Sequence, residues 1–211
     1  KQIIDIICKA LRKDGLSMLT WDDNVQRLQR RVQAVATWHP DRNIPDISTE
    51  HLLDTASEWL PIYLTQGNHL LTTTSELKKL NLAEIVWNII PYDQQQEIDR
   101  LAPTHITVPT GSRILIDSRQ GAQAPIVSVR LQECFGMTTT PCVDDGRCPV
   151  LMELLSPGFK PVQLTQDIES FWSGTYFEIR KELRRRYPKH YWPENPLEAE
   201  AVRGVKRRDN K

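Results

Sequence analysis

The sequence contains no apolar run near the ~20 residues that a membrane-spanning helix needs, and no secretory leader at its start. No membrane partner is therefore expected. The chain begins KQIIDIICKALRK, without Met, which is typical of the interior of a longer protein. Its 39% hydrophobic and 26% charged residues are ordinary for a folded domain, and 211 residues can form one large domain or two small ones.

The sequence also lacks the short motifs that mark most catalytic and cofactor sites. It has no GxxxxGK[ST] phosphate-binding loop, no GxGxxG fingerprint, no HExxH zinc motif and no GxSxG nucleophile elbow. Its five histidines are far apart and are not paired with carboxylates at helical spacing: His39, His51, His69, His105 and His190. We therefore predict no catalytic residue, no cofactor and no metal ligand in this chain, and no enzymatic activity of the chain alone.

The four cysteines include no CxxC pair. Cys8, Cys134, Cys142 and Cys148 are therefore predicted to be free thiols in a reducing cytoplasm. The Asp-Asp-Gly run at 144–146 lacks the ligand spacing of a calcium loop and indicates a turn.

The net charge of zero hides an asymmetry. From Arg180 to Lys211 there are 11 basic and 5 acidic residues, whereas residues 1–179 contain 16 and 22. Positive charge gathered at one end favours an anionic partner such as nucleic acid. The alternative is a solvated face, which we favour for the last ten residues taken alone.

Residues 1–102 are predicted to form a helical bundle. Apolar residues recur at helical spacing in segments that Pro and Gly separate. The first helix is expected to stop at the Asp-Gly pair at 14–15. Asp22, Ser48 and Asn81 stand where the N-caps of later helices are expected.

Residues 103–166 change to short alternating segments, which predict five or six strands. A short helix is expected around Gln132–Phe135, after the third strand, and a hairpin is expected around the turn DDGR at 144–147. A small OB-like β-barrel, the oligonucleotide-binding fold, fits this strand count and helix position. A half-barrel capped by helices fits equally, and the fold class is α+β in either case.

A long helix is predicted from Thr165 or Asp167 to the residue before Pro188. Residues 167–196 would form this basic and aromatic helix with a following clasp, and residues 197–211 a flexible basic tail. The buried stripe of the helix is expected to contain Ile168, Phe171, Trp172, Thr175, Ile179 and Leu183.

The segment RKELRRRYPKHYW, residues 180–192, interleaves basic and aromatic side chains. Guanidinium groups can fork onto phosphates, and aromatic faces can stack bases. The alternative is that the arginines pair with the acidic helical half and the aromatics pack, as we expect for Trp192. We predict phosphate contacts first at Arg184, Arg185, Arg186 and Lys189, and second at Arg113 and Lys160.

Four long and unusual segments are LAPTHITVPTGSRILID, VRLQECFGM, LLSPGFKPVQLTQDIESFW and RKELRRRYPKHYWPENP. Together they resemble the C-terminal region of HrpB-type helicases, bacterial members of the DEAH/RHA group of ATP-dependent RNA helicases. The similarity is strongest from Leu101 to Pro196 and is looser at WDDNVQRLQRRV and LLDTASEWLPIYL. The chain departs from the family at Asp117-Ser118, where Asp-Tyr is usual, at Glu153, where His is usual, and in its tail.

The resemblance implies two RecA-like motor domains earlier in the same polypeptide, which bind ATP and magnesium. It also implies a place for this region beside the RNA path, so single-stranded RNA is the expected partner and the cytoplasm the expected location. None of the resembling motifs is catalytic, so no catalytic residue is carried over.

Two functions are open at this point. The chain is predicted to be an accessory C-terminal region of an RNA helicase, which contributes to RNA binding and to scaffolding of the motor domains. The alternative is a protein-interaction module whose basic helix docks an acidic partner.

Overall fold

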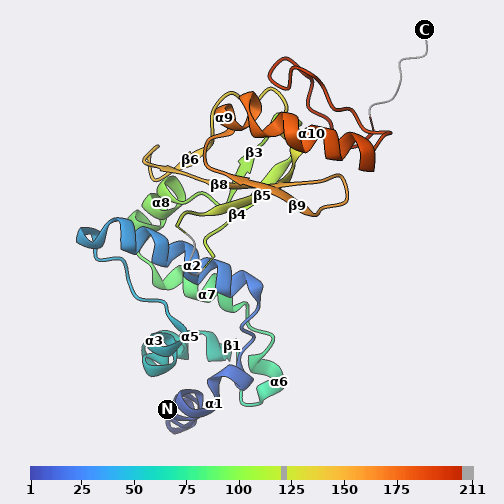
Figure 1. Ribbon diagram of the computed structural model, residues 1–211. Coiled ribbons are helices and arrows are strands. Elements are labelled where there is room, and N and C mark those ends of the chain that lie inside the picture. The colour runs from blue at the N-terminus through green and yellow to red at the C-terminus, as the bar shows by residue number, and fades with distance from the viewer. Residues whose placement is uncertain (120–122, 206–211) are drawn as a thin grey trace. The chain divides into compact units, whose positions relative to one another are not determined.

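The computed structural model describes residues 1–119 and 123–205 (Figure 1). The chain divides into two compact units, Lys1–Asp99 and Arg100–Lys211. The four-part division at 102, 166 and 196 stays a prediction. The α+β class is confirmed.

The first unit is helical. Its elements are α1 (Gln2–Met18), α2 (Asp23–Trp38), a 3-10 turn (Pro40–Arg42), α3 (Thr49–Asp54), α4 (Ala56–Trp59), α5 (Pro61–Leu64), α6 (Thr74–Leu77), α7 (Leu82–Ile89) and α8 (Tyr92–Leu101). Strands β1 (Thr65–Gln66) and β2 (His69–Leu70) form a small hairpin between α5 and α6. Short helices dominate because Pro, Gly and capping residues recur every few residues.

The predicted N-caps of this unit are confirmed. The side chain of Asp22 accepts a hydrogen bond from the backbone N–H of Val25 at 3.0 Å. Ser48 caps α3 and Asn81 caps α7 in the same way. Each cap satisfies an N–H group that the first turn of a helix leaves without a partner.

The predicted end of the first helix coincides with a break in the helical backbone, although a second helical stretch follows it directly. Helix α1 is kinked at Asp14 (φ −123°, ψ 16°) and continues to Met18. Gly15, next to the kink, is buried, and a Cβ there would collide with Leu53 Cδ2. The glycine therefore also permits the close approach of α3.

The second unit is built on a five-stranded sheet. Its strands are β3 (His105–Thr107), β4 (Arg113–Asp117), β5 (Ile126–Arg130), β8 (Leu151–Leu155) and β9 (Pro161–Thr165), in the order β3-β4-β5-β8-β9. All neighbours are antiparallel except β5 and β8, which are parallel. The short helix expected around Gln132–Phe135 is present as a 3-10 helix at Leu131–Cys134. The expected hairpin joins β6 (Cys142–Val143) to β7 (Cys148–Pro149).

The expected OB-like barrel is not confirmed. In the described residues the sheet is open, with β3 and β9 at its two edges. Strand β8 lies between β5 and β9 and pairs with both, so no closure between the edge strands is found in this part of the chain.

The predicted long C-terminal helix is divided in two. Helix α9 (Ile168–Ser173), capped by Asp167, ends at Gly174 (φ −134°, ψ −92°), and α10 (Thr175–Arg186) begins after it. The break shifts the buried face by one residue, so Tyr176 is buried and Thr175 is exposed. Glycine has a low helix propensity. The predicted buried stripe assumed that the helix continues through Gly174, and it therefore placed Thr175 on the buried face.

An aromatic cluster joins these helices to the segment that follows the 3-10 helix. Neighbouring rings of Phe135, Phe171, Trp172 and Tyr176 lie 5.1–6.3 Å apart between centroids. The indole Nε1 of Trp172 donates to the carbonyl oxygen of Met137 at 2.9 Å. The cluster forms the centre of the core in this unit.

Beyond α10 the chain is irregular up to Val205 and packs on the same unit. The N–H of Gly136 donates to Pro196 O at 2.8 Å, and the N–H of Val202 donates to Gln132 O at 3.1 Å. The last part of the predicted flexible tail, residues 206–211, lies outside the described residues. None of the helices described, in residues 1–119 and 123–205, is long and apolar enough to cross a membrane.

Candidate nucleic-acid interface

The end of α10 lies against the turn between β8 and β9. The hydroxyl of Tyr187, which follows α10, is within hydrogen-bond distance (3.3 Å) of Ser156 Oγ in that turn. A Cβ on Gly158 would lie 2.9 Å from the same hydroxyl, so the contact requires glycine there. This contact joins two segments about thirty residues apart in sequence, and it places Lys160 beside the basic end of α10.

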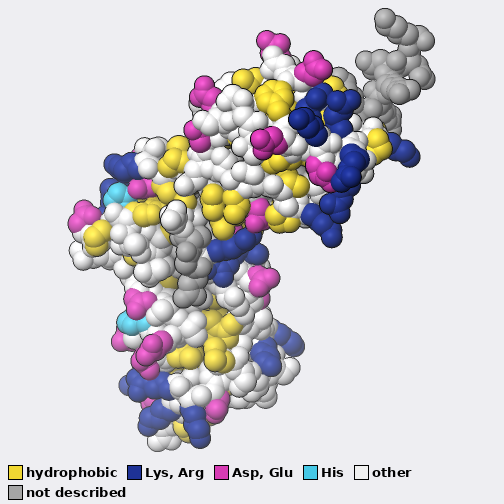
Figure 2. Space-filling model, viewed as in Figure 1, with side chains coloured by type: hydrophobic (Ala, Val, Ile, Leu, Met, Phe, Trp, Pro, Cys, Tyr) yellow, Lys and Arg dark blue, Asp and Glu magenta, His cyan; other side chains and the backbone are white. Residues whose placement is uncertain are grey.

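Three cations in this region are exposed and unpaired. Arg184, Arg186 and Lys189 have exposed side chains, and within residues 1–119 and 123–205 they make no side-chain hydrogen bond or ion pair. Figure 2 shows dark-blue side chains gathered at this end of the second unit. Unpaired guanidinium and ammonium groups are available to bind phosphate oxygens.

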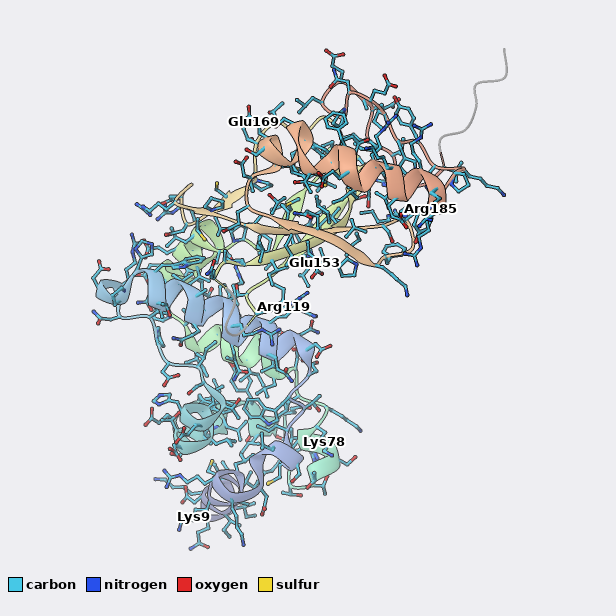
Figure 3. The ribbon with its side chains drawn as sticks, in the orientation of Figure 1. Lys9, Lys78, Arg119, Glu153, Glu169 and Arg185 are labelled. Atoms are coloured by element: carbon cyan, nitrogen blue, oxygen red, sulfur yellow. The ribbon has the colours of Figure 1, made fainter. Side chains whose placement is uncertain are left out.

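Arg185 differs from its neighbours. Its Nη2 donates to both carboxylate oxygens of Glu182, at 2.7 and 2.9 Å, and this hydrogen bond raises the pKa of Arg185 above its usual value. Both side chains are largely exposed, at 78% and 56%, so the pair adds little to stability. Figure 3 shows Arg185 at the C-terminal end of α10. Of the four first-choice cations, Arg185 is the one already engaged.

Two aromatic side chains, Tyr176 in α10 and Trp192 after it, pack inside the unit. Trp192 is buried, its Nε1 donates to Tyr187 O at 3.0 Å, and its own carbonyl oxygen accepts from Arg180 Nε at 2.9 Å. The buried hydroxyl of Tyr176 donates to Pro193 O at 2.7 Å, and burial raises the pKa of Tyr176 above its ordinary range. The predicted role of Trp192 as a packing anchor agrees with these contacts.

A polar hollow of about 330 Å³ opens beside the basic segment. It is lined by Arg180, Arg184, Pro188, His190 and Trp192. Burial, and secondarily the nearby Arg130 guanidinium, lowers the pKa of His190 and so favours its neutral form.

The second-choice cations are separated by the fold. Lys160 is exposed at the end of the β8–β9 turn, next to the basic segment. Arg113 is exposed at the start of β4, opposite Thr107 of β3, and β5 and β8 separate β4 from β9 in the sheet. Lys160 therefore lies on the turn that contacts the segment after α10, whereas Arg113 lies on a strand two removed from β9.

Sequence reasoning missed Phe159 and Arg130. Phe159 is 64% exposed in the β8–β9 turn, and the Arg130 guanidinium lies 4.8 Å from the centre of its ring. The two residues are 29 positions apart, so the sequence does not show that they are in contact. The sequence shows only that a Phe follows the Pro-Gly pair of a predicted turn.

A buried carboxylate holds Arg130 in place. Glu133 is 5% exposed, accepts hydrogen bonds from the hydroxyls of Thr110 (2.9 Å) and Ser112 (2.7 Å), and lies 3.4 Å from Arg130 Nε. Arg203 adds to this network through Ser112 Oγ, at 2.9 Å. Buried charge requires this kind of pairing.

The described residues offer no metal centre. No group of three or more His, Cys, Asp or Glu in residues 1–119 and 123–205 is arranged to hold a metal ion. All four cysteines are free, and burial raises the pKa of the Cys134 thiol to about 12, so this thiol is unreactive.

Comparisons with known proteins identify the family of this chain as the C-terminal region of a helicase. The chain belongs to the family HrpB_C, described as "ATP-dependent helicase C-terminal", whose model matches residues 59–196. The resemblance found in the sequence is thereby confirmed.

One curated relative is "ATP-dependent RNA helicase HrpB" of Escherichia coli (strain K12), 39% identical over 198 residues, which are 94% of this chain and 24% of that protein. The solved structure of the E. coli DExH-box NTPase HrpB matches with a TM-score of 0.81 at 37% identity, over 94% of this chain and 24% of that one. A second, of the E. coli DEAH/RHA helicase HrpB, matches with a TM-score of 0.71 at 36% identity, over 88% and 23%. The chain thus spans about a quarter of the length of these relatives.

Proposed function

We propose that this chain is the accessory C-terminal region of an ATP-dependent RNA helicase, and that it binds single-stranded RNA along the end of α10. The observation that carries the proposal is the set of three exposed, unpaired cations, Arg184, Arg186 and Lys189, with Lys160 beside them. Family membership supports it, since the relatives carry helicase names.

The motor would lie elsewhere in the same polypeptide. ATP and magnesium would bind there, in RecA-like domains that this region scaffolds, and the chain alone would not hydrolyse ATP. The lack of a phosphate-binding loop in the sequence supports this division of labour. We propose a cytoplasmic location for the whole protein, in keeping with its free cysteines.

The proposal assigns the sheet a smaller part than an OB-like barrel would have. The RNA would contact the β8–β9 turn, through Lys160, and the end of α10. We leave Arg113 out of the proposed path because it lies on β4, which β5 and β8 separate from β9 in the sheet.

Fluorescence anisotropy with a labelled single-stranded RNA, at low and moderate salt, tests the proposal. We expect micromolar or tighter binding at low salt. Arg184→Glu, Arg186→Glu and Lys189→Glu together should abolish most of it. Removing three phosphate contacts should also make the slope of log K against log salt shallower by about 2.

A matched control places the same change of charge on the helical unit. Lys9→Glu, Lys78→Glu and Lys79→Glu together alter the net charge equally, at exposed positions; Figure 3 labels Lys9 and Lys78. This control should bind RNA nearly as well as the wild type. Micromolar binding that survives the α10 triple change would contradict the proposal, and would favour docking of an acidic protein partner as the role of the helix.

A further inference from the structure

Phe159 occupies an unusual place for a large aromatic side chain. It lies in the turn between β8 and β9 and is 64% exposed, whereas the rings of Phe135, Trp172 and Tyr176 in the same unit are almost fully buried. An exposed Phe gains little from burial in the folded state. Exposure alone is common for a single apolar side chain, and the backbone and neighbours of Phe159 set it apart.

The backbone of the turn is held in a strained conformation. Phe159 has a φ of +61°, which is costly for a residue with a β-carbon. Its N–H donates to Ser156 O at 2.9 Å, while the N–H of Ser156 donates to Lys160 O at 2.8 Å and the N–H of Lys160 donates to Ser156 Oγ at 3.2 Å. Such strain persists only where the surroundings fix it, and it often marks functional sites.

A cation is fixed against the ring. The Arg130 guanidinium lies 4.8 Å from the ring centre of Phe159 and is held there by the buried carboxylate of Glu133. The cation supports the ring on one side and leaves most of it open to solvent. The ring is therefore presented as a fixed, accessible flat surface.

The surroundings of the ring determine which ligand suits it. The contact between Tyr187 and Ser156 places the turn beside the end of α10, where Arg184, Arg186 and Lys189 are exposed. A flat apolar surface flanked by free cations fits a ligand that has flat rings and negative charges. Single-stranded nucleic acid carries both, as unpaired bases and phosphates.

We propose that Phe159 is a stacking platform for one unpaired base of the bound RNA, with the neighbouring phosphates on the end of α10. This inference rests on the proposed function and adds the means by which the site selects single strands. A base inside a duplex has no free face to offer, so the platform favours unpaired RNA over duplex RNA.

The test uses the full 211-residue chain and a labelled uridine oligomer of about 12 nucleotides, within the ~4–16 that small single-strand-binding domains cover. A duplex of the same length serves as the second probe. Phe159→Ala should weaken binding of the single strand about 5- to 100-fold and change duplex binding less than about twofold. Phe159→Trp should restore the single-strand affinity, because it retains a flat ring.

Phe177→Ala is the matched control, because Phe177 is also exposed (42%) in the same unit and lies in α10. It should leave both affinities unchanged. A direct readout uses 5-iodouridine in the oligomer: irradiation should cross-link it to the peptide that contains Phe159, and mass spectrometry locates the adduct. This readout does not depend on whether a variant folds.

The outcomes separate the two proposals. If the wild-type chain binds RNA and the α10 charge reversal abolishes binding, but Phe159→Ala has no effect on it, the stacking platform is wrong and the proposed function stands. Equal losses for single strand and duplex, or a cross-link elsewhere, would also overturn the platform. If the wild-type chain binds no RNA, both proposals fail together.

Discussion

The two units are stabilised by different kinds of core. In Lys1–Asp99 the largest fully buried side chains are aliphatic: Leu11, Leu52, Leu60, Leu64, Leu77, Ile90 and Ile98. In Arg100–Lys211 they are led by Trp172, Tyr176 and Phe135. The core of the helical unit is mainly aliphatic, with Trp59 as a buried aromatic residue, whereas the second unit concentrates its packing in one aromatic cluster.

Both units contain arginines that pair with carboxylates. In the helical unit Arg31 pairs with Asp99 and Arg42 with Glu97, and in the second unit Arg130 pairs with Glu133. The second unit also contains Arg184 and Arg186, which make no side-chain pair within residues 1–119 and 123–205. Arginines of the first kind are satisfied by the fold, and those of the second kind remain available to a ligand. The zero net charge of the sequence conceals this difference.

The largest loss of stability is expected from Trp172→Ala. This change tests whether the aromatic cluster stabilises the second unit alone. Loss of a fully buried indole and its hydrogen bond to Met137 O should cost about 3–5 kcal/mol of unfolding free energy. Hydrogen exchange followed by mass spectrometry should show faster exchange in β5 and β8, and unchanged exchange in α2.

Leu60→Ala is the reciprocal change. Leu60 is fully buried in the helical unit, so the loss should be about 2–5 kcal/mol and faster exchange should appear in that unit alone. If either variant raised exchange equally in both units, the contrast between two separate cores would be contradicted.

A smaller effect is expected from Glu133→Ala, which sharpens the contrast in arginine use. The change removes the acceptor of two hydroxyl groups and leaves the guanidinium of Arg130 without its carboxylate. Since Arg130 is partly exposed, the loss of unfolding free energy should lie near the lower end of the range for broken buried pairs, at about 3 kcal/mol. Urea denaturation measures it.

Glu169→Ala provides the comparison for Glu133. Glu169 is exposed in the first turn of α9, as Figure 3 shows, so its loss should alter stability by less than about 0.5 kcal/mol. Equal effects of the two substitutions would mean that the buried network does not stabilise the unit.

Local chemistry explains which parts of the fold were predictable. The caps at Asp22, Ser48 and Asn81 and the turn at 144–147 depend on residues within three or four positions, and the sequence shows them directly. The break at Gly174 was missed because a glycine inside a periodic stretch is compatible with either a continuous or a broken helix.

Non-local pairing explains what could not be predicted. Nothing in the strand pattern specifies that β5 pairs in parallel with β8, which leaves the sheet open in the described residues. The candidate site divides in the same way. The cations of α10 are visible as a run in the sequence, whereas the stacking of Arg130 on Phe159 and the burial of Glu133 depend on tertiary contacts.

The smallest effect on stability is expected from the protonation of Glu76 at low pH. The carboxylate of this residue caps α6 in the helical unit. Hydrogen bonds from His69, foremost, and from Thr72 and Thr73 lower the pKa of Glu76 from 4.5 to about 2. Because the folded-state pKa is depressed, the stabilisation is fully present above about pH 4.5 and is lost as the pH falls through about 2. An NMR titration of the Glu76 carboxyl carbon and of the Thr72 and Thr73 amides should show this midpoint.

Asp167, the cap of α9 in the second unit, supplies the internal reference for that titration. Its pKa is also lowered, mainly by the Ser170 hydroxyl. Glu76→Gln should remove the acid-dependent change at Thr72 and Thr73 and leave the Asp167 titration unchanged, because each cap acts only on the first turn of its own helix. A Glu76 midpoint near 4.5, or a shifted Asp167 midpoint in the Glu76→Gln variant, would show that the capping contacts are weaker or less local than the structure indicates.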